Sequence, residues 1–121
     1  MTAPLDVQQS TLDDLIILRL RGDVDLSNVA TLEGALEQVC GDATAGRIVV
    51  DATAIEFFAA VGMNALAQAQ TRCEHDGLDF AVVASQHAVL RPLQITGLDR
   101  QLKIFASVAA ATAERPAQSR R

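Results

Sequence analysis

The sequence predicts an α/β domain with a mixed, mostly parallel β-sheet of about four or five strands and about four helices. Short runs rich in β-branched residues alternate along the chain with segments of helical periodicity. Two of those runs, Arg47–Asp51 and Phe80–Ala84, are apolar at consecutive positions, which is typical of strands covered on both faces. Since 50% of the 121 residues are hydrophobic, the chain can build a core without metal or disulfide cross-links.

The first elements are two strands. Residues 5–9 alternate between apolar and polar side chains, a weak edge-strand pattern, and Asp13-Asp14 indicates a turn. The run Leu15–Leu20 is rich in leucine and isoleucine and predicts a strand. We expect Gly22–Asp25 to end that strand, because glycine and aspartate favour turns.

A helix should follow. Ser27 or Asn28 can cap it, because a short side-chain oxygen accepts hydrogen bonds from the free backbone N–H groups of a helix start. Gly41 suits its C-terminal end. The apolar stripe of this helix has helical spacing and consists of Val29, Leu32, Leu36 and Val39.

The middle of the chain repeats the strand–helix pattern. After the strand Arg47–Asp51, helical periodicity runs from Ala59 to about Asp76, where Gly77 ends it. The strand Phe80–Ala84 follows and is expected to be buried.

The last third contains a short helix, a short strand and a final helix. The first helix lies between residues 85 and 96, and Pro92 either kinks or starts it. Lys103–Phe105 predicts a strand, and Ser107 can cap a helix through about Glu114. With no linker or internal repeat, residues 1–121 are expected to form a single domain, with a core from about 5 to 114 and a polar tail at 115–121.

Composition argues against several classes of protein. The net charge is −5, there is no Trp or Tyr, and aromatic residues make up 3% of the chain. A nucleic-acid-binding protein normally has a basic patch and stacking aromatic residues, so no direct contact with nucleic acid is expected. No apolar run approaches the roughly 20 residues of a membrane span, and no signal peptide is evident. The sequence therefore predicts a cytoplasmic protein that does not insert into a membrane.

The side chains that could carry catalysis do not form a recognisable set. No glycine-rich phosphate loop is present. His75 is expected to be a solvated residue near a helix end, and Ser85 and His87 lie too close in sequence for good nucleophile activation. Asp23 and Asp25 are interpreted as turn residues that can contact a partner, rather than as metal ligands. We therefore expect no enzyme activity, cofactor or metal.

The two cysteines fall on the apolar stripes of the two long helices. Cys40 extends the stripe of Leu32 and Leu36, and Cys73 continues that of Leu66 and Ala69. Buried free thiols are expected, because intracellular cysteines seldom form bridges. If the two helices pack side by side and parallel, both thiols lie near the same end, and a regulatory disulfide is geometrically feasible.

Four stretches occur in a characteristic order and cover roughly residues 10–114. They are Leu15–Gly22 with Asp23-Val24-Asp25, Ile48–Asp51 with Ile55–Phe58, Val61-Gly62-Met63, and Ala88–Arg91 through Thr96–Asp99 to Ile104-Phe105. In order and spacing they resemble the STAS domain family, and within it the bacterial anti-sigma factor antagonists, or anti-anti-sigma factors. The expected fold is therefore a STAS-like single domain.

The resemblance implies that the protein binds an anti-sigma factor of the serine-kinase type and so frees a sigma factor for transcription. In such proteins the kinase phosphorylates a serine at the start of the second helix, and the added charge breaks the complex. Here Ala59–Gly62 occupies the usual Asp-Ser-Ser/Thr-Gly box, with Ala60 in the acceptor position. Asn64, one turn later, cannot accept a phosphoryl group. We expect a protein that docks without being switched off by phosphorylation at this site.

The expected partner-binding surface combines the acidic turn with the start of the second long helix. Its residues are Asp23, Asp25, Ser27, Asn28, Phe57, Phe58, Ala59, Ala60, Val61, Gly62, Met63 and Asn64. Small and apolar side chains in this set would form a knob suited to burial in a partner. Two alternatives remain open: a STAS accessory subunit of a membrane transporter complex, which would contact a cytoplasmic ATPase, and a ligand-sensing STAS domain.

Overall fold

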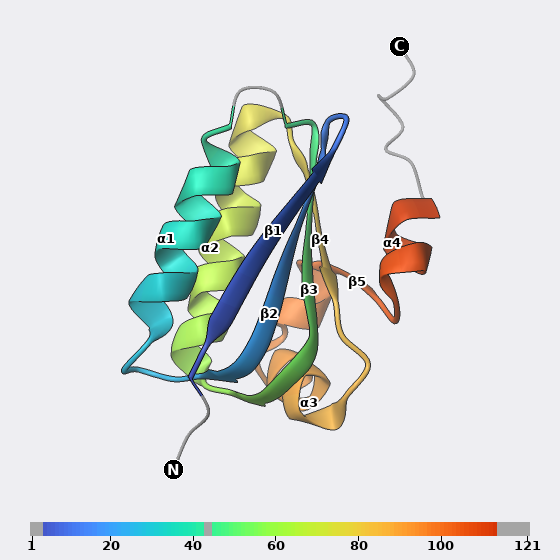
Figure 1. Cartoon of the computed structure of the whole chain (residues 1–121). Coiled ribbons are helices and arrows are strands. Elements are labelled where there is room, and N and C mark those ends of the chain that lie inside the picture. The colour runs from blue at the N-terminus through green and yellow to red at the C-terminus, as the bar shows by residue number, and fades with distance from the viewer. Residues whose placement is uncertain (1–3, 43–44, 114–121) are drawn as a thin grey trace.

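The computed structural model describes residues 4–42 and 45–113, which form one five-stranded sheet with helices on both faces (Figure 1). The elements in chain order are β1 (Asp6–Leu12), β2 (Leu15–Val24), α1 (Val29–Cys40), β3 (Arg47–Phe58), α2 (Ala60–Asp76), β4 (Asp79–Val83), α3 (His87–Thr96), the 3₁₀ turn η1 (Leu98–Arg100), β5 (Lys103–Phe105) and α4 (Val108–Ala113). No helix in these two ranges is long and apolar enough to cross a membrane.

The strands lie in the order β1-β2-β3-β4-β5. The β1–β2 pair is antiparallel, and the other three pairs are parallel. This confirms the predicted mixed, mostly parallel sheet. The parallel connections need crossover helices, which explains why strands and helices alternate from β2 onward.

Two apolar clusters cover the two faces of the sheet. The larger cluster joins the sheet to α1, α2 and α3 through fully buried side chains such as Leu32, Leu66 and Leu93. The smaller cluster lies on the opposite face, where Ala111 of α4 packs against Val49 and its neighbours. Figure 1 shows α1 and α2 side by side on one face and α4 on the other. Because both faces are covered, β4 is buried at every position, as its continuous apolar run predicted.

Both central strands are longer than predicted. The expected break at Gly22–Asp25 is wrong, because β2 continues through Val24, and β3 continues from Asp51 to Phe58. Gly22 adopts a positive φ of 104° and a register shift follows it, so the glycine bends the strand without ending it. Beyond Asp51, β3 pairs with β2 alone, since the β3–β4 pairing stops there.

Most predicted helix boundaries are confirmed. Gly77 ends α2 in the left-handed conformation, with φ 76°. Ser107 Oγ accepts a hydrogen bond from the N–H of Ala110 at 3.0 Å, at the start of α4. Pro92 lies inside α3 and does not start it. The predicted polar tail at 115–121, with Glu114, lies outside the described residues.

Candidate protein-binding site

The ends of β2 and β3 bring two distant segments together. Val24, the last residue of β2, pairs in register with Phe58, the last residue of β3. The N–H of Ala59 donates to the carbonyl oxygen of Val24 at 2.9 Å. The turn after β2 and the first turn of α2 therefore meet at one end of the sheet, as the predicted surface required.

The turn after β2 is held by its own side chains. Asp25 Oδ1 accepts hydrogen bonds from the N–H of Ser27 at 2.9 Å and from its hydroxyl at 2.5 Å. Asn28 Oδ1 accepts from the N–H of Asp25 at 3.0 Å, and Asn28 Nδ2 donates to the Asp23 carbonyl at 2.9 Å. Asn28 is at the N-cap position of α1 but makes no capping hydrogen bond, because its side chain is used in this turn. Leu26 projects from the turn and is 79% exposed.

Gln86 positions the end of β3, and sequence reasoning did not identify it. Its Nε2 donates to the carbonyl oxygens of Ala52 at 2.6 Å and Ile55 at 2.8 Å. The N–H of Ser85 donates to Gln86 Oε1 at 3.1 Å, which fixes the amide. These bonds satisfy β3 carbonyls beyond the end of its pairing with β4. A glutamine before a helix has no sequence signal for such a role.

Exposure divides the predicted contact residues into two groups. Phe57 is 52% exposed, and Ala60 and Asn64 are also exposed. Phe58 and Met63, by contrast, are 3% and 5% exposed and belong to the larger core cluster. The expected apolar knob is therefore smaller than predicted, since these two side chains stabilise the fold.

Gly62 allows α2 to pack directly on the strand ends. A Cβ at this position would lie 2.6 Å from Val24 Cγ1 and 2.9 Å from Phe58 Cε1. Gly34, in α1, is a useful contrast, because a Cβ there would meet nothing within 4 Å. The glycine of the predicted helix start is thus required by close packing.

We expect Gly62→Ala to destabilise the protein by about 2 kcal/mol, because the added methyl overpacks a buried contact. Gly34→Ala is the matched control and should stabilise α1 by up to about 1 kcal/mol, since alanine favours helix interiors. Urea unfolding of both variants measures the difference. Equal stabilisation by the two substitutions would contradict the close approach at Gly62.

The first turn of α2 carries neither charge nor hydroxyl. The N-cap residue Ala59 makes no side-chain cap, and the first turn has no acidic residue. Ala60 and Val61 follow with short apolar side chains, and Ala60 is exposed. The site therefore presents a neutral, apolar helix start next to the turn that carries Leu26.

The residues considered for catalysis or metal binding lie elsewhere. The side chain of His75 is 87% exposed, with Nδ1 3.1 Å from Asp76 Oδ1, as expected for a solvated histidine. Ser85 and His87 are exposed beside the start of α3. Across residues 4–42 and 45–113, no group of three or more His, Cys, Asp or Glu side chains could hold a metal ion.

Comparison with known proteins identifies the family. A family model described as "STAS domain" matches residues 6–111. The chain belongs to the STAS domain family. This STAS domain is 30% identical over 110 residues to the anti-sigma-F factor antagonist RsfB of Mycobacterium tuberculosis, covering 89% of the chain and 88% of RsfB. It is 27% identical over 86 residues to the anti-sigma-F factor antagonist RsfA of the same species, covering 70% of the chain and 67% of RsfA.

A solved structure agrees with these relatives. The crystal structure of an anti-sigma factor antagonist from Mycobacterium paratuberculosis superposes with a TM-score of 0.81 at 26% identity. The match covers 91% of this STAS domain and 92% of that chain. The resemblance to the family that the sequence motifs indicated is confirmed.

Proposed function

We propose that this STAS domain is an anti-sigma factor antagonist that binds an anti-sigma factor and so frees a sigma factor. The docking surface consists of Leu26, Phe57, Ala60 and Asn64, together with the turn at 25–28. The observation that carries this function is the exposure of Leu26, in the turn after β2, and of Phe57, at the end of β3, where the two strands meet the start of α2. The relatives of the chain are named anti-sigma-F factor antagonists.

The physical basis of docking is the burial of these side chains. Leu26 and Phe57 are 79% and 52% exposed, so a partner can remove much apolar surface from water. The surrounding backbone is already held by the Asp25 and Asn28 hydrogen bonds, so little conformational entropy is lost on binding. This role requires no catalysis, and we assign the protein none; its place of action is the cytoplasm.

The partner is an anti-sigma factor of the serine-kinase type, and the complex persists in the presence of ATP. Phosphorylation would add about −1.5 to −2 charge at the helix start, which would oppose burial there. Ala60 offers no hydroxyl, and residues 56–66 contain no Ser, Thr or Tyr. The protein therefore remains competent to bind while the kinase is active.

Truncating the exposed apolar side chains tests the surface. Leu26→Ala and Phe57→Ala should each weaken binding of the anti-sigma factor by about tenfold or more, the loss typical of a buried interface anchor. Leu12→Ala is the matched control, because Leu12 is 69% exposed and precedes the opposite end of β2. Titration calorimetry against purified candidate anti-sigma factors gives the affinities. Equal losses of affinity in all three variants would contradict the proposed docking surface.

The response to ATP tests whether the protein lacks a phosphorylation switch at the start of α2. With the kinase-type partner and ATP, we expect no phosphate on the protein and no dissociation, whereas Ala60→Ser should acquire phosphate and dissociate. Phosphate on Ser27 or Thr53, whose hydroxyls donate to Asp25 and Asp51, would place a switch on a neighbouring residue instead. Dissociation of the unaltered protein by ATP would refute phosphorylation-independent binding. Pull-down of a cytoplasmic ATPase in place of an anti-sigma factor would favour the transporter alternative.

A further inference from the structure

The two cysteines meet where the C-terminal ends of α1 and α2 pack together. Cys40 is the last residue of α1, and Cys73 lies in the last turn of α2. Their Sγ atoms are 3.5 Å apart, and both thiols are free. A disulfide bond of about 2.05 Å needs the sulfur atoms to approach by roughly 1.5 Å. The two long helices therefore pack in the way that the sequence analysis gave as the condition for bringing the thiols together.

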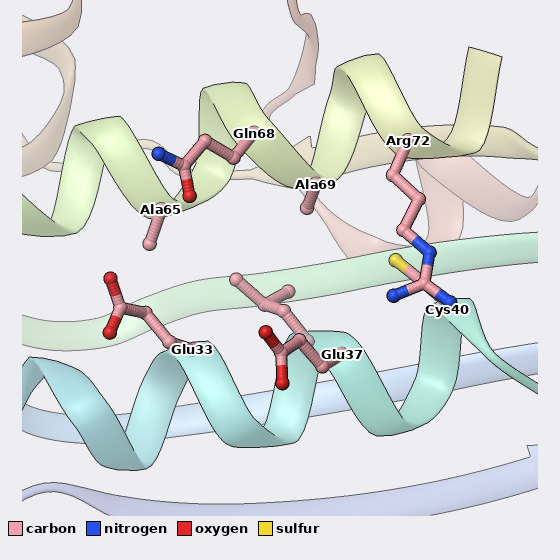
Figure 2. Close-up of a pocket in the computed structure, with 8 residues that line it drawn as sticks. Glu33, Glu37, Cys40, Ala65, Gln68, Ala69 and Arg72 are labelled. Carbon is pink, nitrogen blue, oxygen red and sulfur yellow. The ribbon is translucent and has the colours of Figure 1, made fainter. Parts of the chain in front are cut away.

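Cys40, at 5% exposure, is the more accessible of the two buried thiols. Two surface hollows, of about 170 Å³ and about 290 Å³, are both lined by Cys40 and Arg72. Cys73 lines neither hollow and is 0% exposed. A hydrogen peroxide molecule is only moderately larger than water, which occupies about 30 Å³ in the liquid, so either hollow has room for it. In Figure 2 the guanidinium of Arg72 lies beside the sulfur of Cys40.

The surroundings also make the two thiols chemically different. The hydrogen bond with Cys73 is the main cause that lowers the pKa of the Cys40 thiol from its ordinary value. Burial opposes this change, the positive charge of Arg72 adds to it, and Asp76 opposes it. The same hydrogen bond and then burial raise the pKa of Cys73. Cys40 is thus the thiol that gives up its proton more readily, and Cys73 the one that keeps it.

We propose that Cys40 and Cys73 form a peroxide-reactive site that closes to an intramolecular disulfide. The Cys40 thiolate attacks one oxygen of hydrogen peroxide, the O–O bond breaks, and hydroxide leaves and is protonated to water. The resulting sulfenic acid on Cys40 is then attacked by the sulfur of Cys73, which forms the S–S bond and releases a second water. In total, two thiols lose two electrons and two protons, and one peroxide is reduced to two waters.

The bond would fasten the ends of α1 and α2 that lie away from the partner-binding site. Cys73 lies thirteen positions after Ala60 along α2, which is roughly 20 Å at a rise of about 1.5 Å per residue. The reaction needs no protein partner and uses no residue of the docking surface. Its test is therefore independent of the proposed function.

Mass spectrometry of peroxide-treated protein tests the site. The untreated protein, unfolded and treated with N-ethylmaleimide, should take an adduct on each free cysteine. After peroxide we expect no adduct, a mass lower by about 2 Da and a peptide linking Cys40 to Cys73, all reversed by dithiothreitol. Full alkylation of both cysteines after peroxide would overturn the proposal.

Two cysteine variants test the order of reaction. Cys73→Ser should accumulate a sulfenic acid on Cys40 that dimedone traps, because the resolving thiol is absent. Cys40→Ser should give no dimedone adduct, because Cys73 lines neither hollow and is 0% exposed. Trapping on Cys73 alone would overturn the assignment of Cys40 as the attacking thiol.

The role of Arg72 is tested by a matched pair of variants. Arg72→Gln should slow peroxide oxidation of Cys40 by roughly three- to tenfold, because it removes the cation that favours the thiolate. Asp76→Asn removes the carboxylate that pairs with Arg72 at 3.8 Å. Because that carboxylate raises the pKa of the Cys40 thiol, this variant should not slow the oxidation of Cys40. Equal slowing in both variants would contradict the electrostatic role of Arg72.

Discussion

Ala60→Glu is expected to weaken binding of the anti-sigma factor by at least about 100-fold. Ala60 is the first residue of α2 and is exposed beside the turn that carries Leu26. A carboxylate there would have to lose water on binding without a partner of opposite charge, and it would occupy space that a methyl group leaves open. Titration calorimetry, with the fold checked by circular dichroism, measures the loss.

Two variants separate this effect from a general effect of charge or size. Ala109→Glu places the same charge on an exposed alanine of α4, on the opposite face of the sheet, and should leave affinity within about twofold. Ala60→Ser adds one oxygen atom and, without ATP, should retain most of the binding. Intact binding by Ala60→Glu would show that the start of α2 is not the docking surface.

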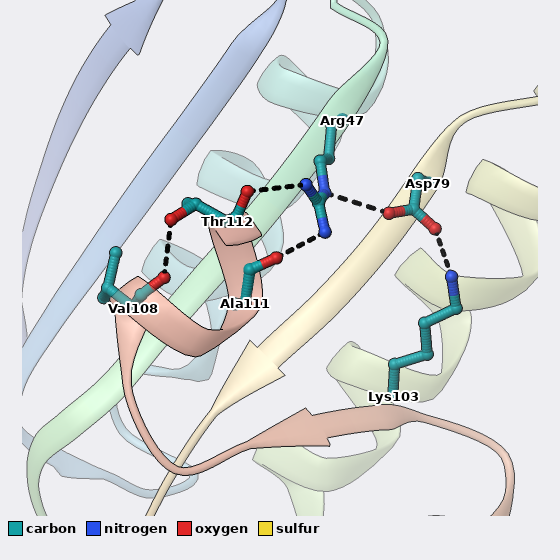
Figure 3. Close-up of polar contacts among 6 residues, drawn as sticks. All are labelled: Arg47, Asp79, Lys103, Val108, Ala111 and Thr112. Atoms are coloured by element: carbon teal, nitrogen blue, oxygen red, sulfur yellow. Dashed lines mark hydrogen bonds and ion pairs between the residues drawn. The ribbon is translucent and has the colours of Figure 1, made fainter. Parts of the chain in front are cut away.

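Asp79→Ala is expected to lower the free energy of unfolding by about 3 kcal/mol. Asp79 is 8% exposed and accepts from Arg47 Nε at 3.0 Å and Lys103 Nζ at 2.5 Å. Arg47 also donates to the carbonyl oxygens of Ala111 and Thr112, so one polar cluster around the buried Arg47–Asp79 pair joins β3, β4, β5 and α4 (Figure 3). Removing the carboxylate leaves a buried guanidinium without its counter-charge, which is the costly way to break such a pair.

Asp76→Ala is the matched control for this loss. It removes the same side chain from an exposed pair with Arg72, at 3.8 Å, and should cost less than about 1 kcal/mol. Urea unfolding of both variants gives the difference. A loss no larger for Asp79→Ala than for Asp76→Ala would show that the cluster does not fasten α4 to the sheet.

The helix boundaries were largely predictable because their signals are local. Gly77 ends α2, since a left-handed residue suits glycine, and Ser107 caps α4 through its own hydroxyl. Strand ends were harder to predict, because a strand continues while a neighbour pairs with it. The pairing of Val24 with Phe58 carries β2 and β3 past the residues where the local sequence indicated a break.

The proximity of the two segments that form the candidate site was predictable, but the exposure of their side chains was not. The sequence motifs placed it at the turn after β2 and the start of α2, where the structure joins the two segments. Local sequence does not separate the exposed Phe57 from the buried Phe58, because that depends on which side of β3 faces the core. Leu26 and Gln86 were missed, since the exposure of Leu26 and the contacts of Gln86 are set only in the folded chain.

The sequence by itself determined the order of strands and helices along the chain, the apolar faces of the two long helices and the lack of a hydroxyl at Ala60, because periodicity and residue identity are local properties. Tertiary structure alone decided the lengths of β2 and β3 and the burial of Met63. It also decided the 3.5 Å contact of the two thiols and the hydrogen bond by which Arg47 holds α4 against the sheet. Each of those features depends on segments far apart in the chain, and their separation in space is set only when the whole sheet has formed.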